Sequence, residues 1–336
     1  MTNENNYKKS KMKEFLRKIK FDKWKAWIYL LPAIVLLAIF TIWPIFNTVR
    51  IAFLEDYSVS EKINAMRLGQ EYKPNFGLYN FKTVVDFKDF GICLKNTVLL
   101  CVLTVPISTV LALLIAVALN SIKFMQRFLQ TIFFLPYVTN SIAIGMVFST
   151  MFKMVGNLIG TENELINTVG IVNNFLQFLG FEKINWMNSG SSYEANIAVM
   201  TIYIVWNALP FKILILLGGL QSVNKQYYEA AKVDGTSRTR IFTRITVPLL
   251  SPMIVYVVIT GFIGGFKEYS SIVGVFGEKM GPVGARGSLN TMVGYIYESI
   301  ELGNQGVASA ASLILFGIIL VVTLINLQVS KKRTHY

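Results

Sequence analysis

The sequence Glu229-Ala230-Ala231-Lys232-Val233-Asp234-Gly235 decides the fold, because this polar, basic stretch lies between two long apolar segments. The residues from about Asn224 to Val233 favour a helix, since none of them is a helix breaker. Asp234-Gly235 then ends this helix, because glycine adopts the left-handed conformation at a helix C′ position without a Cβ penalty. The pattern therefore predicts a short helix followed by a tight turn.

A second short helix is predicted after the turn. Thr236 or Ser237 can cap its start, and Pro248 ends it. Helical spacing places three apolar residues on one side of this helix and three arginines elsewhere; they are Ile241, Phe242 and Ile245, and Arg238, Arg240 and Arg244. Residues 221–248, called the knob below, are expected to form a compact helix-turn-helix with an apolar edge and a basic rim, suited to fit a cleft on another protein.

The residues of the knob resemble a known loop. Glu229-Ala230-Ala231, Gly235 and Ile245-Thr246-Val247-Pro248 are similar to the EAA loop of permease subunits of binding-protein-dependent ABC importers, in which leucine is usual where Val247 stands. The resemblance extends over roughly residues 27–330 and is to the carbohydrate-type subfamily. The other segments that carry it are 206–221, 266–282 and 306–311.

The resemblance implies a transport subunit and not an enzyme. It implies a second permease as heterodimer partner, an extracellular solute-binding protein, and two copies of a separate ATP-binding subunit that bind ATP and Mg²⁺. No cofactor is expected in this chain. The cargo implied is a carbohydrate, with an oligosaccharide preferred because the external loops are sizeable. The alternatives are a glycerol-phosphate-like or peptide-like cargo, or a non-transporting integral-membrane enzyme or scaffold. Coupling to the ATPase is assigned by resemblance to Glu229, Ala230, Ala231, Asp234 and Gly235.

The composition is that of a polytopic membrane protein. The chain has 336 residues, of which 53% are hydrophobic and 15% charged, and its mean hydropathy is +0.50. Its net charge is +13. Because the basic residues flank apolar spans, this charge predicts orientation on an anionic inner leaflet and not nucleic-acid binding. The phosphate-binding pattern GxxxxGK followed by Ser or Thr does not occur, so the chain is not expected to hydrolyse ATP itself.

Six apolar segments are long enough to cross a membrane as helices. They are about 27–49, 95–120, 128–153, 195–220, 249–269 and 307–329. The fold expected is an all-α polytopic membrane protein, with the coupling helix-turn-helix between spans four and five.

The domain organisation expected follows from the spans and from charge. It is a basic segment 1–26, a six-span domain 27–330 with external loops 50–93 and 154–194, and a basic tail 331–336. Aromatic residues predict that loop 50–93 is folded, and residues 171–179 predict a helix in the second external loop. The dense Lys and Arg groups place both termini and the knob in the cytoplasm of a multi-pass plasma-membrane protein.

Polar and aromatic residues within the spans are candidates for a solute path. Pro210 is expected to free backbone groups one turn earlier, near Trp206 and Asn207, and Tyr203 lies one turn before Asn207. Aromatic rings stack on the C–H face of a sugar and amides bond its hydroxyls, so Tyr203, Trp206 and Asn207 are proposed to line the path. Asn140 in the third span is a further candidate. The alternative is that all four make interhelical packing contacts and hydrogen bonds.

Three charged residues lie in or near the fourth and fifth spans. Lys212, in the inner half of the fourth span, is interpreted as snorkelling to the interface. Lys267 and Glu268 lie near the outer end of the fifth span. They either line an external mouth or snorkel, and the second interpretation is preferred. The glycines at 261, 264 and 265 predict close helix packing against the partner permease.

Overall fold

The structure is a computed structural model that describes residue 25 and residues 27–55, 57–122, 126–157 and 166–331. Within these residues, four helices are long and apolar enough to cross a membrane: Trp27–Ala52, Phe90–Ser121, Tyr193–Ser222 and Gln305–Lys331. Two bent pairs of shorter helices raise the number to six if each pair is one span. The expected helical, polytopic fold is confirmed. Of the expected terminal segments 1–26 and 331–336, only Lys25 and Lys331 lie within the described residues.

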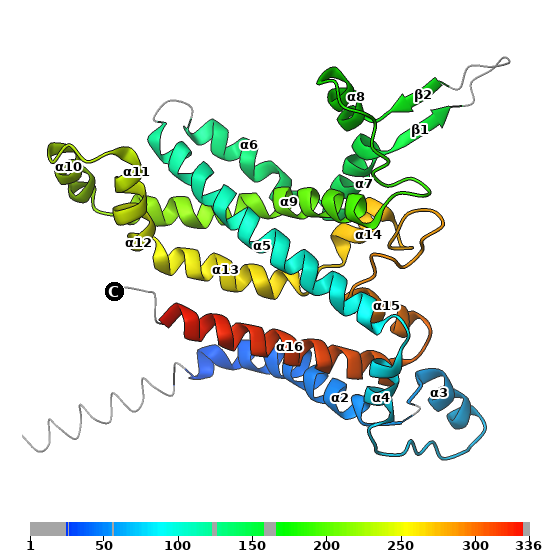
Figure 1. Ribbon diagram of the computed structural model, residues 1–336. Coiled ribbons are helices and arrows are strands. Elements are labelled where there is room, and N and C mark those ends of the chain that lie inside the picture. The colour runs from blue at the N-terminus through cyan, green and yellow to red at the C-terminus, as the bar shows by residue number, and fades with distance from the viewer. Residues whose placement is uncertain (1–24, 26, 56, 123–125, 158–165, 332–336) are drawn as a thin grey trace, which may run out of the picture.

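The centre of the molecule is the pair α5 (Phe90–Ser121) and α9 (Tyr193–Ser222), which pack along each other (Figure 1). α13 (Ser251–Gly265) packs against α5 and α9, and α16 (Gln305–Lys331) packs against α13. The two central helices are apolar on every face, as expected of helices surrounded by protein and lipid. Each contains a proline that does not end it, Pro106 in α5 and Pro210 in α9. Such prolines are tolerated where neighbouring groups satisfy the freed carbonyls.

The third span is not the single helix expected over 128–153. α6 (Gln126–Val138) and α7 (Ser141–Phe152) meet at an angle of 101°. The cause is local: the Asn140 side chain accepts hydrogen bonds from the backbone N–H groups of Ile142 (2.9 Å) and Ala143 (3.4 Å). Asn140 therefore begins a new helix instead of continuing the old one.

The fifth span also begins with a bend. The second knob helix consists of α11 (Arg238–Ile241), the π-helical turn η2 (Phe242–Thr246) and α12 (Val247–Leu249). Together they meet α13 at 68°. The span proper is therefore shorter than the expected segment 249–269.

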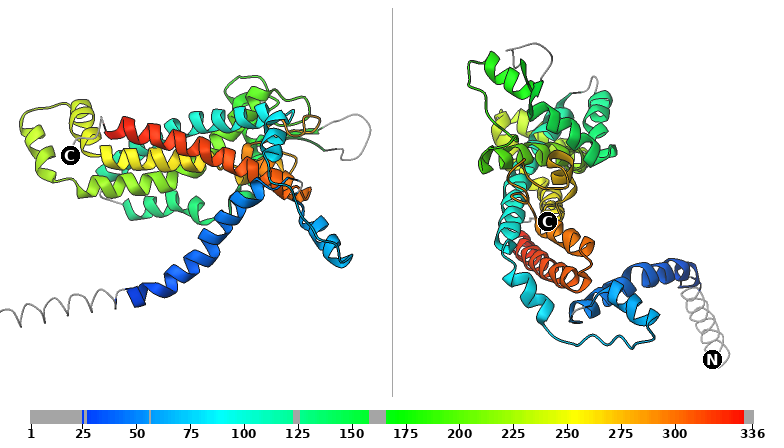
Figure 2. Two further views of the ribbon diagram at one scale, coloured as in Figure 1. Left: turned by 90° about the horizontal axis from the view of Figure 1, so that it is seen from below. Right: turned by 90° about the vertical axis from the view of Figure 1, so that its right-hand side faces the viewer.

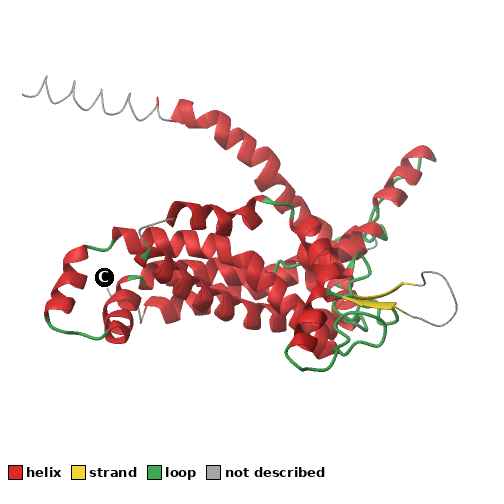
Figure 3. Ribbon diagram, turned by 90° about the horizontal axis from the view of Figure 1, so that it is seen from above, coloured by secondary structure: helices red, strands yellow, loops and turns green. Residues whose placement is uncertain are grey.

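The helices end in two groups of short elements (Figures 1 and 3). The knob lies at one end with α10 (Lys225–Val233) and α11. The other end, called the hairpin end, carries an antiparallel pair of strands, β1 (Met154–Asn157) and β2 (Ile166–Val169). α8 (Ile171–Phe178), α14 (Ser270–Phe276) and α15 (Met292–Glu301) also lie at the hairpin end. α8 confirms the helix predicted at 171–179, whereas the strand pair has no counterpart in the sequence analysis.

Residues 50–93 are folded, as their aromatic content predicted. They contain the end of α2 (Trp43–Ala52), α3 (Val59–Arg67) and α4 (Tyr79–Asp86). The buried Asn80 amide donates to the carbonyl oxygens of Ala52 (3.1 Å) and Leu54 (2.8 Å). The rings of Phe53 and Phe76 stack with centroids 5.4 Å apart. These contacts attach α4 to the end of the first span.

The first span stands apart from the bundle (Figure 2, left). It includes a π-helical segment, η1 (Ala38–Ile42), followed by α2, and the apolar window of this span buries none of its residues. Only its second half approaches the bundle, through α2 and α16. Its apolar side chains therefore face outward, as a helix surrounded by lipid requires.

Candidate functional site

The first half of the knob has the structure that its sequence predicted. The Asn224 side chain accepts a hydrogen bond from the Gln226 backbone N–H at 3.0 Å and so caps α10. The helix ends at Val233, and Gly235 takes a positive φ of 65°. The Thr236 N–H then donates to the Ala231 carbonyl at 2.9 Å, which closes the turn. The helix and its glycine stop are confirmed.

The second half of the knob differs in two respects from the prediction. Ser237 lies at the N-cap of α11, although its side chain makes no capping hydrogen bond. Pro248 does not end the helix, which continues to Leu249. The π-helical turn η2 makes Val247 the start of a fresh α-helical segment, so Pro248 occupies its first turn, where a backbone N–H has no helical partner. The chain bends two residues later, at Leu250.

The knob presents four of its five proposed coupling residues to solvent. Glu229, Ala230, Asp234 and Gly235 are exposed. Ala231 is buried at 6% exposure and faces the body of the knob. The proposed contact surface is therefore the outer face of α10 with its turn, and Ala231 supports that surface from behind.

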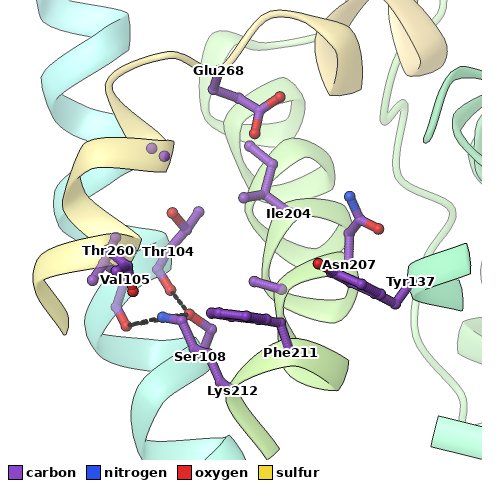
Figure 4. Close-up of a pocket in the computed structure, with 14 residues that line it drawn as sticks. Thr104, Val105, Ser108, Tyr137, Ile204, Asn207, Phe211, Lys212, Thr260 and Glu268 are labelled. Carbon is purple, nitrogen blue, oxygen red and sulfur yellow. Dashed lines mark hydrogen bonds between the residues drawn. The ribbon is translucent and has the colours of Figure 1, made fainter. Parts of the chain in front are cut away.

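A cavity of about 340 Å³ lies between α5, α6, α9 and α13 (Figure 4). This volume is at the lower end of the range typical of small-molecule sites. The cavity combines hydroxyl, amide, charged and aromatic groups with small residues. Its lining residues are Thr104, Val105, Ser108, Tyr137, Ile204, Asn207, Ala208, Phe211, Lys212, Thr260, Gly261, Gly264, Gly265 and Glu268.

Lys212 lies in the cavity wall and does not snorkel to an interface, so that interpretation is wrong. Its side chain is 4% exposed. The ammonium nitrogen Nζ lies 2.7 Å from Ser108 Oγ, 2.9 Å from Thr109 Oγ1 and 3.2 Å from the Val105 carbonyl oxygen. Acceptors on the neighbouring helix α5 hold the side chain inside the bundle, and the sequence of α9 alone contains no signal of them.

Glu268 lies at the opposite end of the cavity from Lys212 (Figure 4). Its carboxylate accepts a hydrogen bond from the Ser271 backbone N–H at 3.1 Å, and Thr291 donates to its carbonyl oxygen at 2.9 Å. Its neighbour Lys267 is exposed. The preferred interpretation, that both side chains snorkel, is wrong for Glu268, because it is held at the start of α14.

Two aromatic rings form part of the wall beside Asn207 (Figure 4). The rings of Tyr137 and Phe211 are stacked, with centroids 6.1 Å apart and an angle of 18° between their planes. The sequence analysis missed both. Phe211 lies one turn after Asn207 on α9, and this spacing could have indicated it. Tyr137 comes from α6, and its position depends on how α6 packs on α9.

Only Asn207 among the four proposed path residues lines this cavity. Tyr203 is fully buried, and its hydroxyl donates to the Ser141 carbonyl oxygen. Trp206 packs against Phe148, with ring centroids 5.9 Å apart. Asn140 is the cap of α7 described above. The structure thus brings Tyr203 and Trp206 together behind the cavity and leaves Asn140 outside it. Contact with a solute stays a prediction for each.

A bundle of membrane-spanning helices with a polar cavity and a protruding helix-turn-helix is the architecture of a membrane transport component. Residues 108–335 match the profile of the binding-protein-dependent transport system inner membrane component. The chain belongs to this family. Its members are transport subunits, so the alternative of a membrane enzyme or scaffold does not hold.

Individual relatives agree with the family. The chain is 30% identical to the probable ABC transporter permease protein MG188 of Mycoplasma genitalium, over 87% of this chain and 81% of that protein. It is 33% identical to the arabinooligosaccharides transport system permease protein AraP of Bacillus subtilis, over 76% of this chain and 75% of that protein. The fold is similar to a chain of a bacterial alginate ABC transporter, solved in complex with an alginate pentasaccharide-bound periplasmic protein. That match has a TM-score of 0.71 at 23% identity and covers 95% of this chain and 97% of that one.

Proposed function

We propose that this chain is the permease subunit of an ATP-driven importer that carries a carbohydrate, specifically an oligosaccharide. The observation that carries the proposal is the cavity, in which an amide and several hydroxyls lie beside two stacked rings. Asn207, Thr104 and Thr260 can exchange hydrogen bonds with sugar hydroxyls, while Tyr137 and Phe211 offer ring faces to sugar C–H groups. The relation to a permease for arabinooligosaccharides supports the same class of cargo.

The knob is proposed to couple this path to a separate motor. In the proposed assembly, two ATP-binding subunits hold ATP and Mg²⁺, and one of them receives the exposed face of α10. Glu229 pairs with a basic residue of that subunit, and Ala230 allows close approach because it has no bulky side chain. Movement of the motor on nucleotide binding then moves α9 and α13, which flank the knob in the chain.

The remaining partners are proposed from the family to which the chain belongs. A second permease is proposed to complete the wall of the path, and an extracellular solute-binding protein to deliver the sugar at the hairpin end. Both termini and the knob are proposed to be cytoplasmic, since the basic groups of the sequence gather on that side. Binding proteins of this kind hold the solute first, so they and the cavity share the choice of sugar.

The test is uptake of a labelled oligosaccharide by cells that express the complete importer. Phe211→Ala removes one ring of the cavity wall, and Phe316→Ala on α16 removes an exposed ring away from it. Loss of one ring contact worth ~1.4 kcal/mol lowers uptake efficiency about tenfold for Phe211→Ala. Phe316→Ala is expected to transport normally. Equal uptake by both variants, with equal amounts in the membrane, would show that the cavity is not the path.

A glycerol-phosphate-like cargo is the second candidate, and the Lys212 ammonium in the cavity wall is the observation that favours it. All three N–H groups of Lys212 are already bonded to α5, so it offers such a solute no free donor. Competition separates the two: excess glycerol phosphate leaves uptake of the labelled oligosaccharide unchanged if the cargo is a neutral sugar.

A further inference from the structure

Lys212 is held by a cage of acceptors on α5 on both sides of Pro106. The cage consists of the Val105 carbonyl oxygen and the hydroxyls of Ser108 and Thr109, all within 3.2 Å of the Lys212 nitrogen. α13 closes over this cage at Gly261, where a Cβ atom would lie 3.2 Å from the same nitrogen. The ammonium therefore lies where three helices of the bundle meet.

The geometry of the cage matches the three donors of a charged lysine. Ser108 donates its own hydroxyl hydrogen to the Thr104 carbonyl, and Thr109 donates its hydrogen to the Val105 carbonyl at 2.7 Å. Both hydroxyl oxygens are thus left as acceptors toward Lys212, as is the Val105 carbonyl. Three acceptors need three N–H donors, and a lysine has three only as an ammonium. A neutral amine would direct its lone pair at an oxygen.

This positive charge has no acidic partner close by. Among the residues that the structure describes, no carboxylate lies within ion-pair distance of Lys212. The one carboxylate in the cavity wall, Glu268, is at the other end and caps α14. A charge in the interior of a membrane protein is costly and is retained where it has a task.

On the side of Lys212 that faces the knob, buried apolar side chains of the same three helices pack into one cluster. This cluster, called the apolar seal, begins directly after Lys212 on α9 and one turn after Ser108 on α5. Its buried members are Ala112, Ala116, Leu119, Ile213, Leu216, Leu217, Leu220, Leu250 and Val257. Lys212 therefore marks the floor of the cavity, at the boundary between its polar lining and the apolar seal.

We propose that Lys212 is an electrostatic barrier that excludes inorganic cations from the solute path when the apolar seal opens. A fixed ammonium at the floor of the cavity repels Na⁺ and K⁺, while an uncharged sugar feels little of its field. Because its three donors are bonded to α5, Lys212 acts through its charge and not through contact with the solute. The proposal rests on the cavity being the solute path, as proposed above.

The experiment uses the complete importer in liposomes, with its second permease, its ATP-binding subunits and its solute-binding protein. Labelled arabinotriose, ²²Na⁺ and ³⁶Cl⁻ uptake are measured during ATP hydrolysis, for the wild type, Lys212→Gln and Lys212→Arg. The wild type and Lys212→Arg are expected to take up sugar with less sodium than chloride. Lys212→Gln is expected to take up sugar with sodium influx raised roughly ten- to a hundredfold, the effect of one charge about 6–12 Å away at an effective dielectric constant of about 20.

Two results overturn the proposal. One is a Lys212→Gln importer that transports sugar and remains as tight to sodium as the wild type. If Lys212→Gln does not assemble, the wild type alone decides: chloride influx that does not exceed sodium influx overturns the barrier. Absence of ATP-driven sugar uptake by the wild type is a different outcome, because it contradicts the proposed cargo. The comparison of sodium with chloride influx then tests Lys212 by itself.

Discussion

The close approach of α7 and α14 gives a prediction whose size can be worked out from distances. A Cβ atom placed on Gly145 would lie 2.7 Å from the Gly274 carbonyl carbon, 2.8 Å from its Cα and 3.1 Å from the Val275 nitrogen. All three are backbone atoms, so no side chain can rotate away. Carbon atoms in favourable contact are ~3.5–4.0 Å apart, so Gly145→Ala forces the two helices about 1 Å apart.

The expected loss is the difference between two effects. Overpacking of this kind costs ~1–3 kcal/mol, and the upper end applies because only backbone can yield. Alanine in place of glycine within a helix returns ~1 kcal/mol. Gly145→Ala should therefore destabilise the protein by ~2 kcal/mol, a fall in the melting temperature of about 3 °C for a chain of this size.

The assay is thermal unfolding of the detergent-solubilised protein, followed by the loss of the monodisperse peak in size-exclusion chromatography. Gly317→Ala in α16 is the matched control, because nothing lies within 4 Å of its Cβ position. That variant gains the helix propensity without the clash and should melt slightly higher than the wild type. The reasoning is refuted if both variants shift in the same direction by a similar amount.

Three further substitutions have defined outcomes. Asn96→Ala removes an amide that bonds two backbone carbonyls and a tyrosine hydroxyl, and should cost ~3 kcal/mol in thermal unfolding; a change under ~1 kcal/mol would mean that water replaces it. Tyr203→Phe removes the hydroxyl that bonds both the carbonyl oxygen and the hydroxyl of Ser141, so stability should fall by ~1 kcal/mol or more. The apparent affinity for sugar should stay unchanged, whereas a weaker affinity would restore Tyr203 to the path. Gly235→Ala strains a residue with positive φ in the knob by ~1–2 kcal/mol and should reduce ATP-driven uptake. Gly303→Ala imposes the same strain at the hairpin end and should leave uptake unchanged. Equal uptake by both variants would contradict a special role for the knob.

The knob could be predicted from the sequence because its structure is set by local interactions. Asn224 caps α10, and Gly235 supplies the positive φ that ends it, both within a few residues of the groups they serve. The long apolar spans were equally accessible, since length and hydropathy decide them. The prediction of one straight third span was wrong because of another local interaction. Asn140, which was proposed for the path, caps α7 and so bends this span.

The cavity could be predicted only in part, because its wall combines residues that are distant in the sequence. Asn207 was found from its polarity within a span, but Tyr137 meets Phe211 only because α6 packs on α9. Lys212 shows the same limit. Its spacing along α9 fits a snorkelling side chain, and only the hydroxyls presented by α5, more than a hundred residues away in sequence, keep it inside the bundle.

The two connections of the knob to the bundle differ in stiffness. On one side the knob follows α9, an unbroken helix of 30 residues that reaches the hairpin end, about 45 Å away. On the other side it meets α13 through the 68° bend at Leu250. A push on the knob can therefore be absorbed as rotation at the bend but not along α9, which must tilt as a rod. In the proposed coupling, a tilt of α9 by about 5° would displace its far end by roughly 4 Å, with rotation at the Leu250 bend.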